Sequence, residues 1–446
     1  MKIIRLHSDN KDVFPEYYSH GKKNAITLSR YTQFQNISSD KIILYSFVSD
    51  AILLLSQIEY EKLCRMDLSD NDDLFYTLSL NGFFIDKNID EYLLMVRQRK
   101  SIFSKIPKTI KFVILPTTNC NARCNYCIGI HNPIDSMTYD TADKVVDYIV
   151  ERAKGYENIK FDWYGGEPLL KRDLITYICD VVHQRLPNVH YSSVVTSNLA
   201  CFDDDTLKQA IQIWNIQKIN ITIDGDEKEH NARKSYVNHN INGYKHTLDC
   251  IRNILEKQIM IYCRYNIDKN NVDQLGSVLY DLKPFFADKH FYFFISPLRG
   301  EDCHEEFYPT SEYNKLFYKT GVILNEAGVH NSIDSFVPKC ANGFCLAKSE
   351  HCIVIGPNGA IYRCNLDELV ASNATGSVFN GLEKNQIYNR FTSLELDGDC
   401  KDCCYLPICQ GGCPIQDKNS SNSNCKCNKL KFKIEGISRL LADYYI

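Results

Sequence analysis

The sequence predicts an α/β fold for residues 109–298, with a parallel sheet that is either doubly wound or part of a barrel. Six short runs rich in β-branched or aromatic residues alternate there with stretches whose apolar residues recur at helical spacing. Such an alternation implies parallel strands joined by right-handed helical crossovers. A second observation concerns cysteine, because eleven of the 20 cysteines lie between Cys340 and Cys427. We therefore expect a cysteine-rich segment behind the sheet.

The order of the expected elements places functional residues at one edge of this sheet. The expected strands are Ile110–Thr118, Ile159–Tyr164, Val189–Ser197, Ile219–Asp224, Ile259–Asn266 and His290–Ser296. The expected helices are Thr141–Arg152, Leu170–Arg185, Asp204–Trp214, Tyr244–Lys257 and Val272–Leu282. In parallel sheets the chemistry gathers at the carboxyl ends of the strands, so the residues that follow each strand are the candidates for a site.

Two further regions flank the sheet, as expected for a chain of 446 residues at about 150 residues per domain. Residues 1–105 are expected to form a small α+β domain, with strands at Ile26–Leu28 and Ile42–Val48 and a helix over Ala51–Leu63. Residues 106–325 contain the sheet. Residues 326–446 are turn-rich and cysteine-dense, with a polar loop at Asp417–Asn424 and a closing helix at Leu430–Tyr445.

Composition excludes several classes of function. A net charge of −4 removes the electrostatic argument for a nucleic-acid partner. The longest apolar stretch, Ile42–Leu55, is shorter than the roughly 20 residues that a membrane helix requires, and no signal peptide begins the chain, so we expect a cytoplasmic protein. Because disulfides are rare in such a reducing compartment, the 20 cysteines favour metal or cluster ligation.

Three of these cysteines directly follow the first expected strand. Cys120, Cys124 and Cys127 lie within eight residues, in a segment whose threonine and asparagine residues disfavour a helix. A [4Fe-4S] cluster needs four ligands, which are usually cysteine thiolates. Three thiols in one loop leave one iron open, and an open iron can bind a substrate or cofactor.

The Cys-x3-Cys-x2-Cys spacing, with Tyr126 before the last cysteine, resembles the signature of the radical S-adenosylmethionine (radical SAM) enzymes. Gly165-Gly166-Glu167-Pro168, at the end of the second strand, resembles the motif of that family that is associated with the amino group of SAM. The resemblance implies a partial (β/α)6 TIM-like barrel and an enzyme that cleaves SAM to a 5'-deoxyadenosyl radical. It also implies a set of cofactor-binding residues: Gly165, Gly166, Glu167, Ser197, Asn198, Asp224, Arg264 and Asn266.

The C-terminal cysteines resemble the seven-cysteine pattern of SPASM domains, which carry auxiliary [4Fe-4S] clusters in radical SAM enzymes. The resemblance implies that one auxiliary cluster is bound by Cys345, Cys364, Cys413 and Cys340, and the other by Cys400, Cys403, Cys409 and Cys427. Cys352 remains an alternative to Cys340, and Cys425 an alternative to Cys427. A zinc ribbon is the competing interpretation of the paired Cys-x2-Cys units. The expected cofactors are thus three [4Fe-4S] clusters and SAM.

The residue after Cys364 narrows the expected reaction. Sulfatase-maturing members of the family have an aspartate there, whereas this chain has Asn365, which cannot accept a proton at neutral pH, and its next carboxylate is Asp367. The resemblance therefore favours a maturase of ribosomally made precursor peptides (RiPPs) that installs a thioether or carbon-carbon crosslink. The alternatives are a sulfatase-maturing enzyme, a peptide epimerase, and a non-catalytic iron-sulfur or zinc protein.

Two partners follow from this interpretation: a precursor peptide with a leader, and an electron donor such as flavodoxin or ferredoxin. The N-terminal domain is expected to recognise the leader as an added β-strand, at an edge formed by Ala25–Leu28 or Lys41–Phe47 beside the helix Ala51–Leu63. The competing interpretation is that this domain only caps the barrel.

Overall fold

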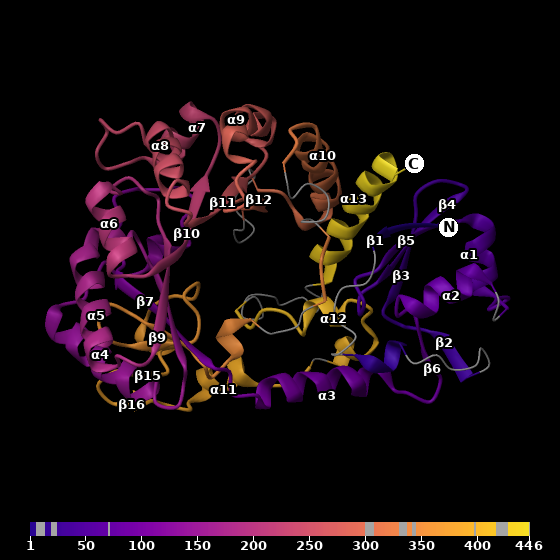
Figure 1. The fold of residues 1–446 in the computed structure, drawn as a ribbon, viewed down its shortest axis with the longest axis horizontal. Helices are drawn as coiled ribbons and strands as arrows, with labels where there is room; N and C mark the ends of the chain where they lie inside the picture. The colour runs from indigo at the N-terminus through magenta and orange to yellow at the C-terminus, as the bar shows by residue number, and fades with distance from the viewer. Residues whose placement is uncertain are drawn as a thin grey trace.

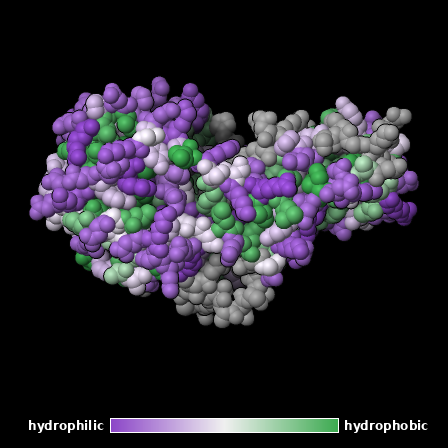
Figure 2. All heavy atoms as spheres, turned by 90° about the horizontal axis from the view of Figure 1, so that it is seen from below, coloured by the Kyte–Doolittle hydropathy of each residue, from purple (hydrophilic) through white to green (hydrophobic). Residues whose placement is uncertain are grey.

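The computed structural model describes residues 1–5, 14–18, 25–69, 72–298, 307–329, 337–340, 345–396, 398–415 and 427–445. Asp417–Asn424 and Cys425 lie outside these residues. The chain forms a wide lobe built around the large sheet and a narrower N-terminal lobe, and the helix α3 (Glu91–Ser104) runs between them (Figure 1). Figure 2 shows the same two lobes from below, with polar side chains over most of the wide lobe. Within the described residues, no helix has the length and hydropathy that crossing a membrane requires.

The wide lobe confirms the α/β prediction. Its parallel strands follow one another in chain order, as in a partial TIM-like barrel, and their bounds are β7 (Thr109–Thr117), β8 (Asn158–Gly165), β9 (His190–Thr196), β10 (Ile216–Ile223), β11 (Met260–Ile267) and β12 (Phe291–Pro297). The expected crossover helices are present as α4 (Tyr139–Arg152), α5 (Arg172–Arg185), α6 (Asp204–Gln212), α8 (Gly243–Leu255) and α9 (Leu275–Leu282). Strand β7 is buried on both faces: Ile110, Phe112 and Ile114 belong to the main core, and Val113 and Leu115 pack in a second cluster on the other face.

Two helices of this lobe were not expected from the sequence. The helix α7 (Glu227–Lys234) follows β10 and is capped by the Asp226 side chain, but its apolar content is too low for a periodic signal. The helix α10 (Tyr313–Glu326) packs against the C-terminal helix α13 (Cys427–Tyr445), which begins three residues before its expected start.

The cysteine-rich segment continues the barrel sheet. Strand β13 (Cys352–Ile355) pairs in parallel with β7, and β14 (Ile361–Tyr362) pairs with β13 in the antiparallel direction. The sheet therefore has eight strands and crosses the expected boundary near residue 325. The remaining elements of this segment are short: β15 (Gly376–Ser377), β16 (Gly381–Leu382), α11 (Gln386–Thr392) and α12 (Leu406–Cys409).

The N-terminal lobe is α+β, but two expectations about it are wrong. Its sheet has the order β1-β5-β4-β3, from β1 (Lys2–Arg5), β5 (Ile52–Ser56), β4 (Lys41–Ser46) and β3 (Thr32–Asn36). The expected helix Ala51–Leu63 is a strand in its first half, because its apolar run is buried between two neighbouring strands, and only α1 (Gln57–Cys64) is helical. The expected edge at Lys41–Phe47 is an interior strand, since β4 pairs on both sides. The lobe also contains α2 (Asp73–Leu80) and a two-stranded sheet of β2 (Ile26–Leu28) and β6 (Phe84–Asp86).

The N-terminal lobe shares its core with the C-terminal segment. The ring of Phe47 packs 5.3 Å from the ring of Tyr405, and the Ser438 hydroxyl of α13 donates to the Tyr45 hydroxyl at 3.2 Å. The Asp50 carboxylate accepts a hydrogen bond from the backbone N–H of Cys340 at 2.5 Å. These contacts are buried, so the two regions are expected to unfold together.

Phe47→Ala tests this shared core. The side chain is 3% exposed, so we expect its loss to lower the free energy of unfolding by about 3–5 kcal/mol. Limited proteolysis should also become faster within residues 398–415, because Tyr405 loses its partner. Tyr76→Ala, at a residue that is 62% exposed in the same lobe, is the control and should change neither quantity. Faster cleavage confined to residues 1–105 would show that the two regions unfold independently.

Candidate active site

The three-cysteine loop lies at the carboxyl end of β7, as the sequence predicts. The thiols of Cys120, Cys124 and Cys127 are close enough to interact electrostatically, and burial raises the pKa of Cys120 to about 11. The thiol therefore stays protonated at neutral pH unless a metal displaces the proton. Among the described residues, no three His, Cys, Asp or Glu side chains could hold a single metal ion. The ligands of a cubane cluster bind different irons, so each of the three thiols can bind one iron of such a cluster.

Gly165 and Gly166 attach this loop to β8. The N–H of Gly166 donates to the Thr117 carbonyl at 3.1 Å, and the N–H of Glu167 donates to the Asn119 carbonyl at 2.9 Å. A Cβ at Gly166 would lie 2.2 Å from the Asn119 carbonyl oxygen, and one at Gly165 would lie 2.2 Å from that of Thr117. Glycine is therefore required here because two backbones approach each other closely.

Glu167 organises the next strand end. Its carboxylate is 1% exposed and accepts hydrogen bonds from the backbone N–H groups of Leu169 and Asn198 and from the Ser197 hydroxyl, at 3.1, 2.8 and 2.9 Å. Burial raises its pKa to about 7, although these hydrogen bonds oppose the shift. The Asn198 amide in turn donates to Asn121 at 2.7 Å, within the cysteine loop. These bonds connect Glu167, Ser197 and Asn198 to the loop.

Asp224 anchors the other side of the loop through a buried network. It accepts hydrogen bonds from the Tyr126 hydroxyl at 2.7 Å and from the Asn266 amide at 2.7 Å, and its carboxylate lies 3.0 Å from the Lys234 ammonium. Burial alone would raise the pKa of Asp224, but the Lys234 charge and the Tyr126 hydroxyl lower it to about 2. Sequence reasoning missed Lys234, because it lies on the unexpected helix α7 and no motif marks it.

A cavity of about 450 Å³ lies against this loop, a volume within the usual range for small-molecule sites. Seven of the predicted site residues line it: Cys120, Cys124, Cys127, Gly165, Gly166, Arg264 and Asn266. Glu167, Ser197, Asn198 and Asp224 belong to the networks behind it. Arg264 Nε is buried without a hydrogen-bond partner in the described part of the chain, which fits a site for an anionic group such as a carboxylate.

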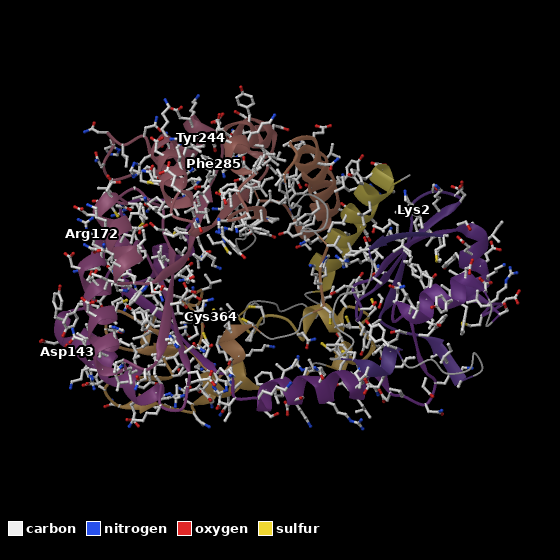
Figure 3. All side chains as sticks on the ribbon, in the orientation of Figure 1. Lys2, Asp143, Arg172, Tyr244, Phe285 and Cys364 are labelled. Carbon is white, nitrogen blue, oxygen red and sulfur yellow. The ribbon has the colours of Figure 1, made fainter. Side chains whose placement is uncertain are left out.

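The cysteine-rich segment forms the opposite wall of the same cavity. Asn365, Leu366 and Asp367, which follow Cys364, line it together with Tyr164 of β8. Cys364 lies on the inner side of the wide lobe, whereas Asp143 and Arg172 lie on its outer helices (Figure 3). The sequence singled out Asn365 and Asp367 as candidate substrate-side residues. It could not predict that they line the same cavity as the cysteine loop, because this depends on the pairing of β13 with β7.

Most of the described cysteines that are expected to bind auxiliary clusters fall into two groups. Cys364 interacts electrostatically with Cys345 and Cys413, as expected for one auxiliary cluster. Cys400 and Cys409 both interact with the Arg99 guanidinium, and the N–H of Cys403 donates to the Cys400 carbonyl at 3.4 Å.

The last ligand of each auxiliary cluster stays a prediction, with Cys340 or Cys352 for the first cluster and Cys427 or Cys425 for the second. The Cys340 thiol contacts the Pro407 carbonyl at 3.7 Å, whereas Cys352 interacts with Cys345. Cys427 begins α13, but its side chain and all of Cys425 lie outside the described residues.

Gly166→Ala tests the close contact between β8 and the cysteine loop. Because the added methyl group meets rigid backbone, we expect the free energy of unfolding to fall by about 1–3 kcal/mol. Reconstituted iron should also decrease, since the loop must move. Gly276→Ala on α9 is the matched control, because no atom lies within 4 Å of its added Cβ. Equal stability and iron content in the two variants would contradict this account of Gly166.

The chain is similar to several known proteins. Residues 114–275 match the radical SAM superfamily. A cysteine-type anaerobic sulfatase-maturating enzyme of Clostridium novyi is 26% identical over 375 residues, covering 75% of this chain and 96% of that protein. An uncharacterized protein of Methanocaldococcus jannaschii is 27% identical over 266 residues, covering 57% of this chain and 85% of its own.

Two solved structures share the fold. Native anSMEcpe with bound AdoMet has a TM-score of 0.60 at 15% identity, and the match covers 75% of this chain and 98% of that one. Streptococcus suis SuiB bound to the precursor peptide SuiA has a TM-score of 0.53 at 16% identity, and the match covers 90% of this chain and all of that one. Together with the cysteine loop and the cavity beside it, the family match identifies a radical SAM domain at residues 114–275, and the sulfatase-maturating relative supports an enzyme that uses SAM radical chemistry.

Proposed function

We propose that the chain is a radical SAM peptide maturase that abstracts hydrogen from a ribosomally made precursor peptide and installs a thioether or carbon-carbon crosslink. The observation that carries this proposal is the shared cavity, in which the cysteine loop and the Asn365–Asp367 segment face one space. Cys120, Cys124 and Cys127 would hold a [4Fe-4S] cluster, which would supply the electron for cleavage of SAM to methionine and a 5'-deoxyadenosyl radical, and flavodoxin or ferredoxin is the proposed donor. Two auxiliary clusters in the SPASM segment complete the cofactor set.

The residues of the chain bind and orient the cofactor in this proposal. Arg264, with its unpartnered Nε, binds the SAM carboxylate. Asn266 is fixed by Asp224, so its position relative to the cavity is set before SAM arrives. Glu167 contributes to the binding of the SAM amino group indirectly. Its oxygens already accept hydrogen bonds from Leu169, Ser197 and Asn198, so it holds these residues in position.

Asp367 is the proposed proton acceptor on the substrate side. Its carboxylate lines the cavity, its side chain is 9% exposed, and Arg390 Nη2 lies 3.9 Å away. Forming a thioether from the substrate radical requires the substrate thiol to lose its proton, which a carboxylate can accept, and requires one electron to leave as the carbon-sulfur bond closes, which an auxiliary cluster would accept. Asn365 cannot replace it in this role.

Sulfatase maturation is the second candidate function, because the Clostridium novyi relative has that name and matches 75% of this chain. The two candidates differ in the modified peptide. Mass spectrometry of a cysteine-containing sulfatase peptide and of a small peptide encoded beside this gene separates them. Modification of the sulfatase peptide alone would establish the second candidate.

The proposed cluster set predicts a specific pattern of iron loss. Anaerobically reconstituted protein should hold about twelve irons, from three clusters of four. Replacing Cys120, Cys124 and Cys127 together by alanine should leave about eight irons and abolish 5'-deoxyadenosine formation. The alanine variant of Cys179, a buried thiol on α5, is the control and should keep the iron content and the cleavage activity. About four irons with bound zinc in the parent protein would contradict the auxiliary clusters.

We further propose that the N-terminal lobe recognises the leader of the precursor at the outer edge of β3. Within the described residues β3 pairs only with β4, so its other side is available to an added strand. The N–H of Phe47 donates to the Tyr31 carbonyl, so the alternation of an antiparallel pair directs the N–H groups of Phe34 and Asn36 outward.

Asn36→Pro tests this edge. Proline removes an outward N–H without removing a bond between β3 and β4, so the fold should persist. We expect leader affinity, measured by fluorescence anisotropy with the neighbouring small peptide, to fall about 2- to 12-fold, as for one hydrogen bond of about 0.5–1.5 kcal/mol. SAM cleavage without peptide should not change. Wild-type affinity in a folded variant would place leader recognition elsewhere.

A further inference from the structure

Two buried arginines lie beside the two groups of C-terminal cysteines. Arg99 and Arg363 are each 2% exposed and are among the largest fully buried side chains of the described residues. Placing a guanidinium in the interior costs several kcal/mol, so each needs compensating contacts. In both cases the contacts include backbone carbonyls of the cysteine-rich segment.

Arg363 connects the backbone beside two cysteines of the first group. Its Nε and Nη2 donate to the Ala347 carbonyl at 3.1 and 2.9 Å, and Nη2 also donates to the Ser349 carbonyl. These carbonyls lie just after Cys345, and Arg363 immediately precedes Cys364. The guanidinium therefore fixes the separation of two expected ligands that are 19 residues apart in the sequence. Its Nη1 is buried without a hydrogen-bond partner among the described residues, which leaves one donor for an anionic neighbour.

Arg99 makes the equivalent contacts around the second group. It lies on α3, outside the cysteine-rich segment, and donates from Nη1 to the Gln410 carbonyl at 2.6 Å and from Nη2 to the Leu394 carbonyl at 3.4 Å. Residues 394 and 410 flank the segment that contains Cys400, Cys403 and Cys409. One guanidinium therefore joins the two ends of this loop. Its charge also interacts with the thiols of Cys400 and Cys409.

An iron-sulfur cluster with thiolate ligands is anionic, and nearby charge and hydrogen bonds set its stability and potential. We propose that Arg99 and Arg363 are positioning residues. Each holds the backbone around one auxiliary cluster site in place before the iron binds. Arg363 prepares the site of Cys345, Cys364 and Cys413, and Arg99 prepares the site of Cys400, Cys403 and Cys409. This inference rests on the auxiliary clusters of the proposed function. It adds that the second site is incomplete without α3, the helix that runs between the two lobes.

The test compares Arg99→Met with Arg363→Met, so that each variant is the control for the other. Methionine keeps an unbranched side chain but removes the donors and the charge. Each variant should lose about four of about twelve irons. The electron paramagnetic resonance spectrum of reduced Arg99→Met should lack the same signal as Cys400→Ala, and that of Arg363→Met the same signal as Cys364→Ala. SAM cleavage without peptide should persist in both variants, because the cysteine loop of Cys120, Cys124 and Cys127 is separate from the two auxiliary cluster sites.

Lysine variants keep the test decisive where a methionine variant does not fold. Lysine retains the charge but lacks the planar fork that reaches two carbonyls. We expect Arg99→Lys and Arg363→Lys to bind iron and to release about four irons to a chelator at least tenfold faster than the parent protein. Parental iron content and release rates in all folded variants would overturn the inference, as would loss of the same signal from both methionine variants. About four irons in the parent protein would instead refute the proposed auxiliary clusters.

Discussion

The candidate active site depends on one close contact between two backbones at the carboxyl ends of β7 and β8. The N–H groups of Gly166 and Glu167 donate to the carbonyls of Thr117 and Asn119, and the backbones are so close that a Cβ at Gly165 or Gly166 would lie 2.2 Å from one of these carbonyl oxygens. This contact fixes the loop against the barrel before any cofactor binds. It also places the Glu167 carboxylate where it can accept the backbone N–H of Asn198 on the following strand. Contacts at the strand ends therefore connect β7 to β8 and β8 to the residue that follows β9, in the same order as the strands of the sheet.

Buried charge holds the opposite side of the loop. Asp224 and Lys234 have side chains that are 0% and 4% exposed, and both contact the Tyr126 hydroxyl. Removing either charge would leave the other buried without its counter-ion, so this network specifies the position of Tyr126 strongly. The cysteine-rich segment closes the cavity because β13 pairs with β7, and that pairing brings Asp367 to a space that also contains Cys120.

Local pattern was enough to predict the barrel strands, the cysteine loop and seven of the residues that line the cavity. Each of these depends on periodicity or on spacing within a few residues. The errors lie where distant pairing decides the structure. Ala51–Leu63 has a helical pattern, yet its first half is buried as a central strand, where a continuous apolar run is favourable. Lys234 was missed because its role depends on α7 folding back beneath the loop, and Arg99 because its partners are about 300 residues away in the sequence.

The central claim is that the loop of Cys120, Cys124 and Cys127 carries the cluster that binds SAM. Electron paramagnetic resonance of the reduced protein with and without SAM tests it most directly. We predict that SAM shifts the signal of one cluster only, that this signal is missing from the triple alanine variant, and that the other signals do not respond. A SAM response that persists in the triple variant, or no response in the parent protein, would contradict the account.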